Sequence, residues 1–224
     1  FAALRRWSVS SFDLILIATS ELEAEARPFG LPVVVLPDPI PGVPPARPNA
    51  DTPAALREVV VIASYAVDEP IDQVLEAARR CPDLRFSITG EPPSELRGRT
   101  PENVELTGYL PHADFQALLG GAACVVALTT EEGCFQRGAC EALAHARPLV
   151  TSDTAALRSY LGEAAVFVEP TALAIARGVR DALARSSELE RAARRRREEI
   201  RALDRANLAS VLERIDAMAA GPPA

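Results

Sequence analysis

Short apolar runs alternate with stretches of helical periodicity along most of this chain. From residue 57 onward the apolar runs are continuous, near 57–63, 84–89, 103–107, 122–128, 148–151 and 164–168. Such runs are typical of strands buried on both faces of a parallel sheet. The intervening segments predict helices near 69–80, 112–119, 137–145, 154–160 and 171–184. This alternation predicts an α/β protein with a Rossmann-like, doubly wound parallel sheet.

The N-terminal residues show a smaller version of the same pattern. Residues 12–18 and 32–37 read as two short strands, and the stretch between them reads as a short helix. Ser20 is placed to cap that helix and Gly30 to end it. The proline-rich segment 38–54 that follows cannot form a helix or a central strand, so we expect a linker.

A helical region is expected at the C-terminal end, up to about residue 218. Ser187 and Glu190 have the spacing of a capping box at its start. The arginine-rich run 191–201 reads as a solvated helix face. Contact with an anionic membrane is the alternative interpretation, which the interspersed glutamates weaken.

The segment 127–153 carries most of the functional information. An apolar strand ends at Thr129 and Thr130, a loop follows, and a helix begins before Glu141. In open parallel sheets, ligands bind where a strand's carboxyl end passes into a helix. The amides and dipole of a helix start favour phosphate, and Glu141, about one turn into the helix, is placed to accept hydrogen bonds from a ribose. The segment therefore predicts a nucleotide site.

Composition narrows the classes of function. The net charge is −7 and the sequence pI is about 5.0, which argues against nucleic acid as the main partner. All 24 basic residues are arginines, so mechanisms that need a lysine base, Schiff base or phosphate-loop lysine are excluded.

The cysteines and the apolar runs suggest a cytoplasmic protein. The four cysteines form no CxxC pair and have no histidine at metal-ligand spacing, so we expect reduced structural thiols. No apolar run approaches the roughly 20 residues of a membrane helix, and no signal peptide is visible. The chain begins with Phe1 rather than Met, and we expect a fragment or a processed product.

Several motifs together resemble the C-terminal, donor-binding half of a GT-B glycosyltransferase of the retaining, family 4-like type. They are VVVLPDPIP before the linker, FSITG at 86–90, VELTGYLP at 104–111 and EEGCFQRGACEALAHARPLVTSD at 131–153. The resemblance covers roughly residues 12–217. It implies a nucleotide-activated sugar as donor and a glycan, polysaccharide or lipid-linked acceptor.

The resemblance also assigns roles to individual residues. Glu141 matches the ribose-binding glutamate, and Glu132 matches a glutamate that faces the donor sugar. It implies catalytic roles for Glu132 and Arg137. The donor-binding residues that it implies are Gly90, Tyr109, Leu110, Thr130, Gly133, Gln136, Gly138 and Glu141. Of these, Gln136 and Gly138 would face the diphosphate with Arg137, while Tyr109 and Leu110 would line the base.

The expected chemistry needs no metal and no cofactor. A leaving nucleoside diphosphate develops negative charge, which backbone donors and an arginine can stabilise. No Asp-x-Asp motif is placed to hold a metal ion. The donor is then a nucleoside-diphosphate sugar whose base the sequence leaves open.

The sequence departs from the family pattern in three places. Eight residues separate Glu132 from Glu141, one more than in the family. The family carries an arginine and a lysine after the first strand of this half, where this chain reads SYAVDEP at 64–70. Most of the N-terminal half, which supplies the acceptor site, is missing, so we expect little transferase activity from this chain alone.

The expected domain organisation follows from the resemblance. Residues 1–37 are interpreted as a remnant of the N-terminal GT-B domain and 38–54 as the interdomain linker. Residues 55–185 are the donor-binding Rossmann-like domain, 186–218 C-terminal helices and 219–224 a tail. The expected partners are the donor, the acceptor and the N-terminal half, with no nucleic acid; a location at the inner face of the membrane is kept as an option.

Other interpretations remain open. A GT-B nucleotide-sugar epimerase shares the architecture, although we find no convincing set of extra catalytic acids. A non-catalytic binding or assembly module would explain the missing arginine and lysine. At the level of residues, Glu141 as a helix-face acid, Glu132 as a solvated loop acid and Arg137 as a surface residue are the alternatives. Asp153 is expected to cap the helix that follows it, with an approach to the donor as the alternative.

Overall fold

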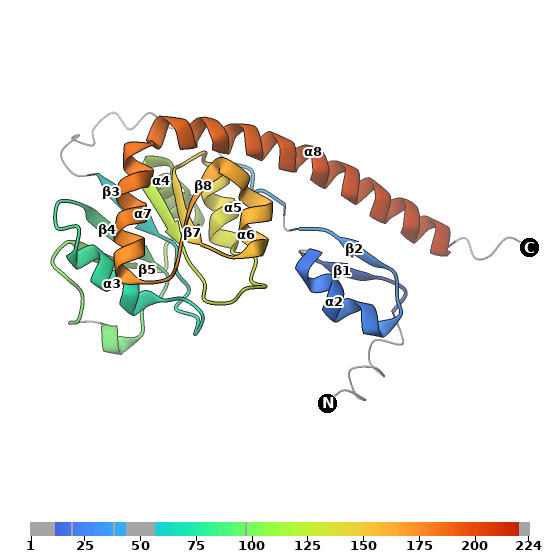
Figure 1. Ribbon diagram of the computed structural model, residues 1–224, viewed down its shortest axis with the longest axis horizontal. Helices are drawn as coiled ribbons and strands as arrows, with labels where there is room; N and C mark the ends of the chain where they lie inside the picture. Colours follow the sequence, from blue (N-terminus) through green and yellow to red (C-terminus); the bar gives the residue numbers. More distant parts are fainter. Residues whose placement is uncertain (1–11, 19, 38, 44–56, 97, 220–224) are drawn as a thin grey trace, which may run out of the picture. The chain divides into compact units, whose positions relative to one another are not determined.

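The computed structural model describes residues 12–18, 20–37, 39–43, 57–96 and 98–219 (Figure 1). Of the expected linker at 38–54 only residues 39–43 fall within these ranges, and of the tail at 219–224 only residue 219 does. The chain divides into two compact units, one of residues 40–197 and one of residues 1–39 with 198–224. The expected domain boundaries remain a prediction, and each unit is described by itself.

The larger unit is built on a six-stranded parallel sheet. Its strands are β3 (Glu58–Val61), β4 (Arg85–Thr89), β5 (Val104–Gly108), β6 (Cys124–Ala127), β7 (Leu149–Ser152) and β8 (Ala165–Val168). They lie in the order β5-β4-β3-β6-β7-β8, and every pair is parallel. The predicted Rossmann-like doubly wound sheet is confirmed. The order reverses between β3 and β6, so the switch point of the fold lies at their carboxyl ends.

Continuous apolar sequence makes the central strands fully buried. Every residue of β6 and β7 is buried, and Val59 and Val60 of β3 have no exposed surface. Val59 pairs with Cys124 and Val61 with Val126 across the switch point. β-branched side chains suit this environment because they pack well on a pleated surface.

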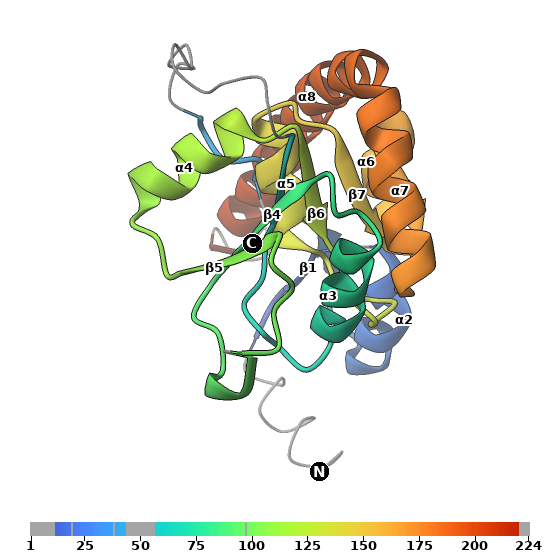
Figure 2. The same cartoon turned by 90° about the vertical axis from the view of Figure 1, so that its left-hand side faces the viewer.

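Helices cover both faces of the sheet. They are α3 (Ile71–Arg79), α4 (His112–Gly121), α5 (Arg137–Ala144), α6 (Ala155–Leu161) and α7 (Ala172–Ala184). Two short 3-10 turns, Ser94–Leu96 and Gly162–Ala164, complete the connections. α4 lies on one side of the sheet, and α3 and α7 lie together on the other (Figure 2). Asp83 and Arg180 form an ion pair at 2.6 Å that links the segment after α3 to α7.

The expected cap of α6 by Asp153 is wrong. The N-cap residue is Thr154, whose hydroxyl accepts a hydrogen bond from the Leu157 amide at 3.3 Å. The Asp153 carboxylate instead pairs with Arg158, at 2.7 Å for Oδ2. This pair holds the pKa of Asp153 below its ordinary value. Aspartate and threonine side chains both accept hydrogen bonds from amides at helix starts. The N-cap position is occupied by Thr154, one residue after Asp153.

The smaller unit contains a two-stranded parallel sheet of β1 (Ile15–Ile17) and β2 (Val33–Val35) (Figure 1). The predicted helix between them is split into a 3-10 turn at Ser20–Leu22, α2 (Glu23–Ala26) and a 3-10 turn at Arg27–Phe29. Gly30 ends it as expected, with φ of 72° and its amide donating to the Arg27 carbonyl at 3.1 Å.

The C-terminal segment is a single helix, α8 (Ser186–Ala219). In its arginine-rich part, Arg196 donates to the carbonyl oxygens of Ser159 and Tyr160, and Arg197 donates to that of Ala144. The expectation of a wholly solvated face is therefore wrong for these two residues. Their guanidinium groups satisfy carbonyls in the last turns of α6 and α5, where a cation also suits the helix dipole.

Candidate nucleotide site

Two loops flank the switch point of the sheet. The β3–α3 loop comprises residues 62–70, and the β6–α5 loop comprises residues 128–136. Asp68 ties them together. Its carboxylate accepts from the Thr129 hydroxyl at 2.6 Å, and its carbonyl accepts from the Thr130 amide at 2.7 Å and the Thr130 hydroxyl at 3.1 Å. These hydrogen bonds join the two loops at the position where open α/β sheets bind ligands.

The start of α5 is packed tightly against the strands of the switch point. A Cβ on Gly138 would lie 3.0 Å from Ala127 Cβ and 3.1 Å from Ile62 Cγ2. A larger residue at this position would require Ala127 or Ile62 to move by a few tenths of an ångström. Gln136 is the N-cap residue, but its side chain does not cap the helix; its amide donates to the Leu128 carbonyl at 2.9 Å. The fold thus places the start of α5, which has no side-chain cap, at the switch point of the sheet.

Glu141 lies one turn into α5 and is mostly shielded, with 13% of its side chain exposed. Its Oε2 accepts from Gln116 Nε2 of α4 at 3.2 Å, and its Oε1 lies 4.0 Å from Arg137 Nε. Gln116 Oε1 is 2.8 Å from His145 Nε2. The carboxylate is therefore held at one end of a short polar chain rather than lying freely on the helix face.

The environment of the histidine at the other end of that chain favours its neutral form. Burial, followed by the charges of Arg147 and Arg197, lowers the pKa of His145 from its usual value. Because Gln116 uses its amide nitrogen as the donor to Glu141, its oxygen is the acceptor for His145 Nε2–H. His145 thus fixes the orientation of Gln116, which in turn orients Glu141.

Glu132 is engaged at the start of α6. Its Oε1 accepts from the amide of Ala155, the first residue of α6, at 2.6 Å. A carboxylate at a helix start is favoured by the dipole. Among the other predicted residues of this loop, Thr130 and Gly133 are exposed, and Arg137 has 62% of its side chain exposed at the first position of α5.

Gly90 belongs to the loop after β4. Its φ is +87°, and a Cβ there would lie 2.2 Å from the Ala63 carbonyl oxygen in the β3–α3 loop. Gly90 and Gly108 form an isolated antiparallel bridge, which brings the ends of β4 and β5 together. Just after it, Tyr109 is 82% exposed and Leu110 is half-buried. These residues lie at the same carboxyl edge of the sheet as the two loops.

The β3–α3 loop is rich in carboxylates. The Glu69 carboxylate accepts from the amides of Ser64 and Ala66 and from the Ser64 hydroxyl. Tyr65, between them, has φ of 60°, which is unusual for a residue other than glycine. Burial, followed by the charges of Glu69 and Glu91, raises the pKa of Tyr65 to about 12.

The same carboxylates face the β6–α5 loop. The pKa of the Cys134 thiol is raised above its ordinary value, first by burial and then by the charges of Asp68, Glu131 and Glu69; a hydrogen bond with Thr129 opposes the shift. A thiol with a raised pKa is a poor nucleophile, which agrees with the expectation of reduced structural thiols.

Four residues of this site were not singled out from the sequence as site residues. Ser64, Asp68 and Glu69 shape the first loop, and Gln116 positions Glu141. The acids at 68 and 69 were visible as a departure from the family pattern, but their hydrogen bonds depend on the loop's path. Gln116 carried no signal, because it lies 25 positions from its partner on a different helix.

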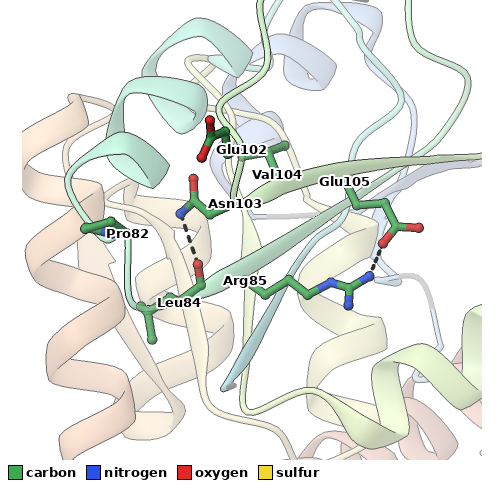
Figure 3. Close-up of a pocket in the computed structure, with 7 residues that line it drawn as sticks. All are labelled: Pro82, Leu84, Arg85, Glu102, Asn103, Val104 and Glu105. Carbon is green, nitrogen blue, oxygen red and sulfur yellow. Dashed lines mark hydrogen bonds and ion pairs between the residues drawn. The ribbon is translucent and has the colours of Figure 1, made fainter. Parts of the chain in front are cut away.

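A pocket elsewhere on the larger unit is lined by residues that bond to other parts of the protein (Figure 3). It lies where β4 and β5 begin, at the edge opposite the switch-point loops, and is lined by Pro82, Leu84, Arg85, Glu102, Asn103, Val104 and Glu105. The Asn103 amide donates to the carbonyls of Ala78, Cys81 and Leu84, and Arg85 pairs with Glu105. The polar side chains of Asn103, Arg85 and Glu105 are therefore engaged within the protein, where they stabilise the fold.

Neither a metal centre nor a membrane span is found in the described part of the chain. No group of three or more His, Cys, Asp or Glu side chains there could hold a metal ion. No helix among those residues is both long and apolar enough to cross a bilayer.

The strand order defines a Rossmann-like α/β domain, with the packed start of α5 at its switch point. The chain belongs to the family described as glycosyl transferases group 1, whose pattern matches residues 57–185. No curated protein matches the chain. The expectation of a GT-B C-terminal half is confirmed by this match and by the structural similarities.

Solved structures share the fold across nearly the whole chain. Sucrose-phosphate synthase from Thermosynechococcus elongatus is 18% identical with a TM-score of 0.80, covering 98% of this chain and 62% of its own. The pneumococcal O-GlcNAc transferase GtfA, in complex with UDP and GlcNAc, is 15% identical with a TM-score of 0.70, covering 96% and 47%. Anabaena Alr3699/HepE, in complex with UDP and glucose, is 12% identical with a TM-score of 0.69, covering 99% and 68%. The chain therefore spans less than two thirds of the first two.

Proposed function

We propose that this chain is the donor-binding part of a glycosyltransferase that uses a nucleotide-activated sugar. One observation carries the proposal: Gly138 allows an α5 start without a side-chain cap to pack directly at the switch point, with Glu141 held one turn further on. Amides at a helix start attract a diphosphate, and a carboxylate one turn away is within reach of a ribose. Family membership supports the same class of ligand.

Within this proposal, six of the predicted residues have a defined task. The diphosphate lies over the start of α5, where Gly138 keeps the backbone close and Arg137 adds a positive charge. The ribose hydroxyls donate to Glu141, whose orientation Gln116 and His145 already fix. The base lies near Tyr109 and Leu110, and Gly90 lets the neighbouring loop approach the donor.

Arg137 and the backbone amides would assist departure of the nucleoside diphosphate. Negative charge grows on the leaving phosphate as the bond to the sugar breaks, and fixed donors stabilise that charge without rearranging. Glu132 is the weakest assignment, because a contact with the donor sugar requires its carboxylate to leave the Ala155 amide. Retention at the sugar carbon and the nature of the acceptor belong to the proposal for the whole enzyme, which needs an N-terminal half.

A second candidate is a binding or assembly module that has lost catalysis. The observation that favours it is the β3–α3 loop, whose amides are occupied by Glu69 and which carries no basic residue between 64 and 70. The two candidates differ in whether a nucleotide enters the crevice at all.

Calorimetry on the 224-residue chain tests the proposal. UDP is the first ligand to try, because it is the nucleotide in the complexes of GtfA and HepE; GDP and UDP-glucose follow. We expect binding of UDP, weakened at least about tenfold by Glu141→Ala, which removes charged hydrogen bonds to the ribose. Glu141→Gln keeps the side chain's size and should lose less.

The matched control is Glu76→Ala. Glu76 is a partly exposed acid of α3 that pairs with Arg79 and Arg80, so its removal changes net charge equally without touching the candidate site. Circular dichroism should first show that both variants are folded. If the Glu141 and Glu76 variants then bound UDP equally well, the assignment of Glu141 to the ribose would be contradicted. If none of the three ligands bound, the result would favour the assembly module.

A further inference from the structure

The β3–α3 loop already contains an anion-binding site that is filled by the protein itself. Glu69 Oε2 accepts from the Ser64 amide at 2.8 Å and from the Ala66 amide at 3.3 Å, and Glu69 Oε1 accepts from the Ser64 hydroxyl at 2.9 Å. Amides that converge on one point around a residue with positive φ, here Tyr65 at 60°, form a backbone nest for an anion.

This nest lies at the switch point and not at a remote turn. Ser64 follows Ala63, whose amide donates to the Thr89 hydroxyl at 3.3 Å at the end of β4. Ile62, two residues before Ser64, meets the start of α5 at Gly138. Asp68, next to Glu69, is bonded to Thr129 and Thr130 of the opposite loop. The nest therefore borders the crevice in which the proposed diphosphate lies.

The charges around the nest act in the same direction. After burial, which is the main cause of both shifts, Glu69 and Glu91 raise the pKa of Tyr65, and Asp68, Glu131 and Glu69 raise that of Cys134. These shifts report carboxylates within electrostatic range of both loops. An incoming diphosphate meets this negative field as well as the occupied amides, so its binding depends strongly on where the Glu69 carboxylate lies.

We propose that Glu69 is a built-in competitor of the diphosphate: its carboxylate occupies the nest of Ser64 and Ala66, and an anionic ligand gains those amides only when Glu69 swings out. The inference rests on the proposed function for the identity of the ligand. Hydrogen bonds to a charged group are stronger than those between neutral groups, so the competition sets the affinity of the site for its donor.

Inorganic pyrophosphate is the direct probe, because it carries the diphosphate charge without base, ribose or sugar. It is titrated into the ¹⁵N-labelled chain, with the amides of Ser64 and Ala66 as reporters. In Glu69→Ala the nest is empty, and we expect both amides to shift at a pyrophosphate concentration at least about tenfold lower than in the unmodified chain. Glu69→Gln, which keeps an acceptor but no charge, should lie between them and serves if the alanine variant does not fold.

Asp72→Asn is the matched control. Asp72 lies in the first turn of α3, 68% exposed and paired with Arg99, so the variant removes the same charge without entering the nest. We expect it to respond to pyrophosphate as the unmodified chain does. If Asp72→Asn and Glu69→Ala gained equally in affinity for pyrophosphate, net charge alone would explain the effect and the proposal would be overturned. It would also be overturned if pyrophosphate did not shift the amide signals of Ser64 and Ala66 in either Glu69 variant.

A parallel titration with UDP separates this inference from the proposed function. Tighter UDP binding by Glu69→Ala supports both. UDP that binds the unmodified chain and Glu69→Ala equally, with no pyrophosphate response at the nest, overturns the competitor role and leaves the donor site standing. Pyrophosphate shifts at Ser64 and Ala66 in Glu69→Ala, with no UDP binding by any variant, support the competitor and contradict the donor site.

Discussion

The two loops at the switch point receive the same position from the fold but meet anions differently. The β6–α5 loop leads into a helix start that no side chain caps, followed by Arg137 and the held carboxylate of Glu141. The β3–α3 loop turns its amides onto its own Glu69 and contains no basic residue. The comparison teaches that topology supplies backbone donors, whereas local side-chain charge decides whether a ligand can use them.

The largest expected effect comes from closing the β3 side with Gly90→Ala. The new Cβ would lie 2.2 Å from the Ala63 carbonyl oxygen, at a φ of +87°. Strain and overlap with backbone together should cost about 3 kcal/mol or more in free energy of unfolding. Urea denaturation measures this loss.

Gly30→Ala is the control for that variant. Gly30 has a similar φ of +72° with nothing within 4 Å of the added Cβ, so only the conformational cost of about 1–2 kcal/mol should remain. If the two variants lost equal stability, the close approach of Gly90 to Ala63 would not matter.

Gly138→Ala perturbs the β6 side and should have the next largest effect. Its Cβ would meet Ala127 at 3.0 Å and Ile62 at 3.1 Å, both apolar side chains that can give way slightly. We expect a loss of about 1–2 kcal/mol and weaker UDP binding, because α5 must move outward. Thermal denaturation and calorimetry measure the two effects.

Gly120→Ala in α4 provides the opposite sign. The nearest atom to its Cβ would be His145 Nδ1 at 3.7 Å, an ordinary contact. Alanine favours a helix over glycine by up to about 1 kcal/mol, so this variant should be stabilised or unchanged. Equal destabilisation at 120 and 138 would show that packing at the switch point is not special.

Glu132→Ala distinguishes a structural from a donor-binding carboxylate. Loss of its bond to the Ala155 amide should cost about 1 kcal/mol of stability, as Thr154→Ala should at the neighbouring cap. With the carboxylate engaged at α6, we expect little change in UDP-sugar affinity. A drop in that affinity without a drop in melting temperature would establish Glu132 as a donor contact.

Tyr65→Phe should have the smallest effect at neutral pH. The buried Tyr65 hydroxyl has no hydrogen-bond partner among the described residues, so its removal is expected to be neutral or slightly stabilising. The difference appears in alkali. The folded pKa of Tyr65 is about 12, above its ordinary value of 10.0, so the unfolded chain loses this proton first.

The sign of the pH dependence follows from linkage. Where the folded state binds more protons than the unfolded state, stability falls as pH rises, here between pH 10 and about 12. Tyr65→Phe should lose less stability than the unmodified chain over this window. Parallel alkaline curves for the two proteins would contradict the raised pKa.

The fold was largely predictable because its strands are continuous apolar runs. Each of the six strands of the larger unit lies within two residues of its predicted range, and Gly30 ends its helix as expected. The cap of α6 was missed because Asp153 and Thr154 are adjacent and chemically similar. The fate of Arg196 and Arg197 was missed because their carbonyl partners lie 36, 37 and 53 positions away.

The site was predictable in position but not in detail. The strand–loop–helix pattern located α5 and Glu141 from sequence alone, since both depend on local periodicity. The nest of Glu69 and the chain from His145 through Gln116 to Glu141 depend on the exact path of the backbone between distant elements. Such hydrogen bonds leave no periodic signal in the sequence.

A crystal structure of the chain with UDP would test the central claim most directly. The account predicts that the diphosphate lies between the loops 62–70 and 128–136, with its oxygens at the amides that open α5 and the ribose hydroxyls on Glu141. A nucleotide bound anywhere else, such as the pocket at Arg85 and Glu105, or bound with Glu141 contacting only Gln116, would contradict it.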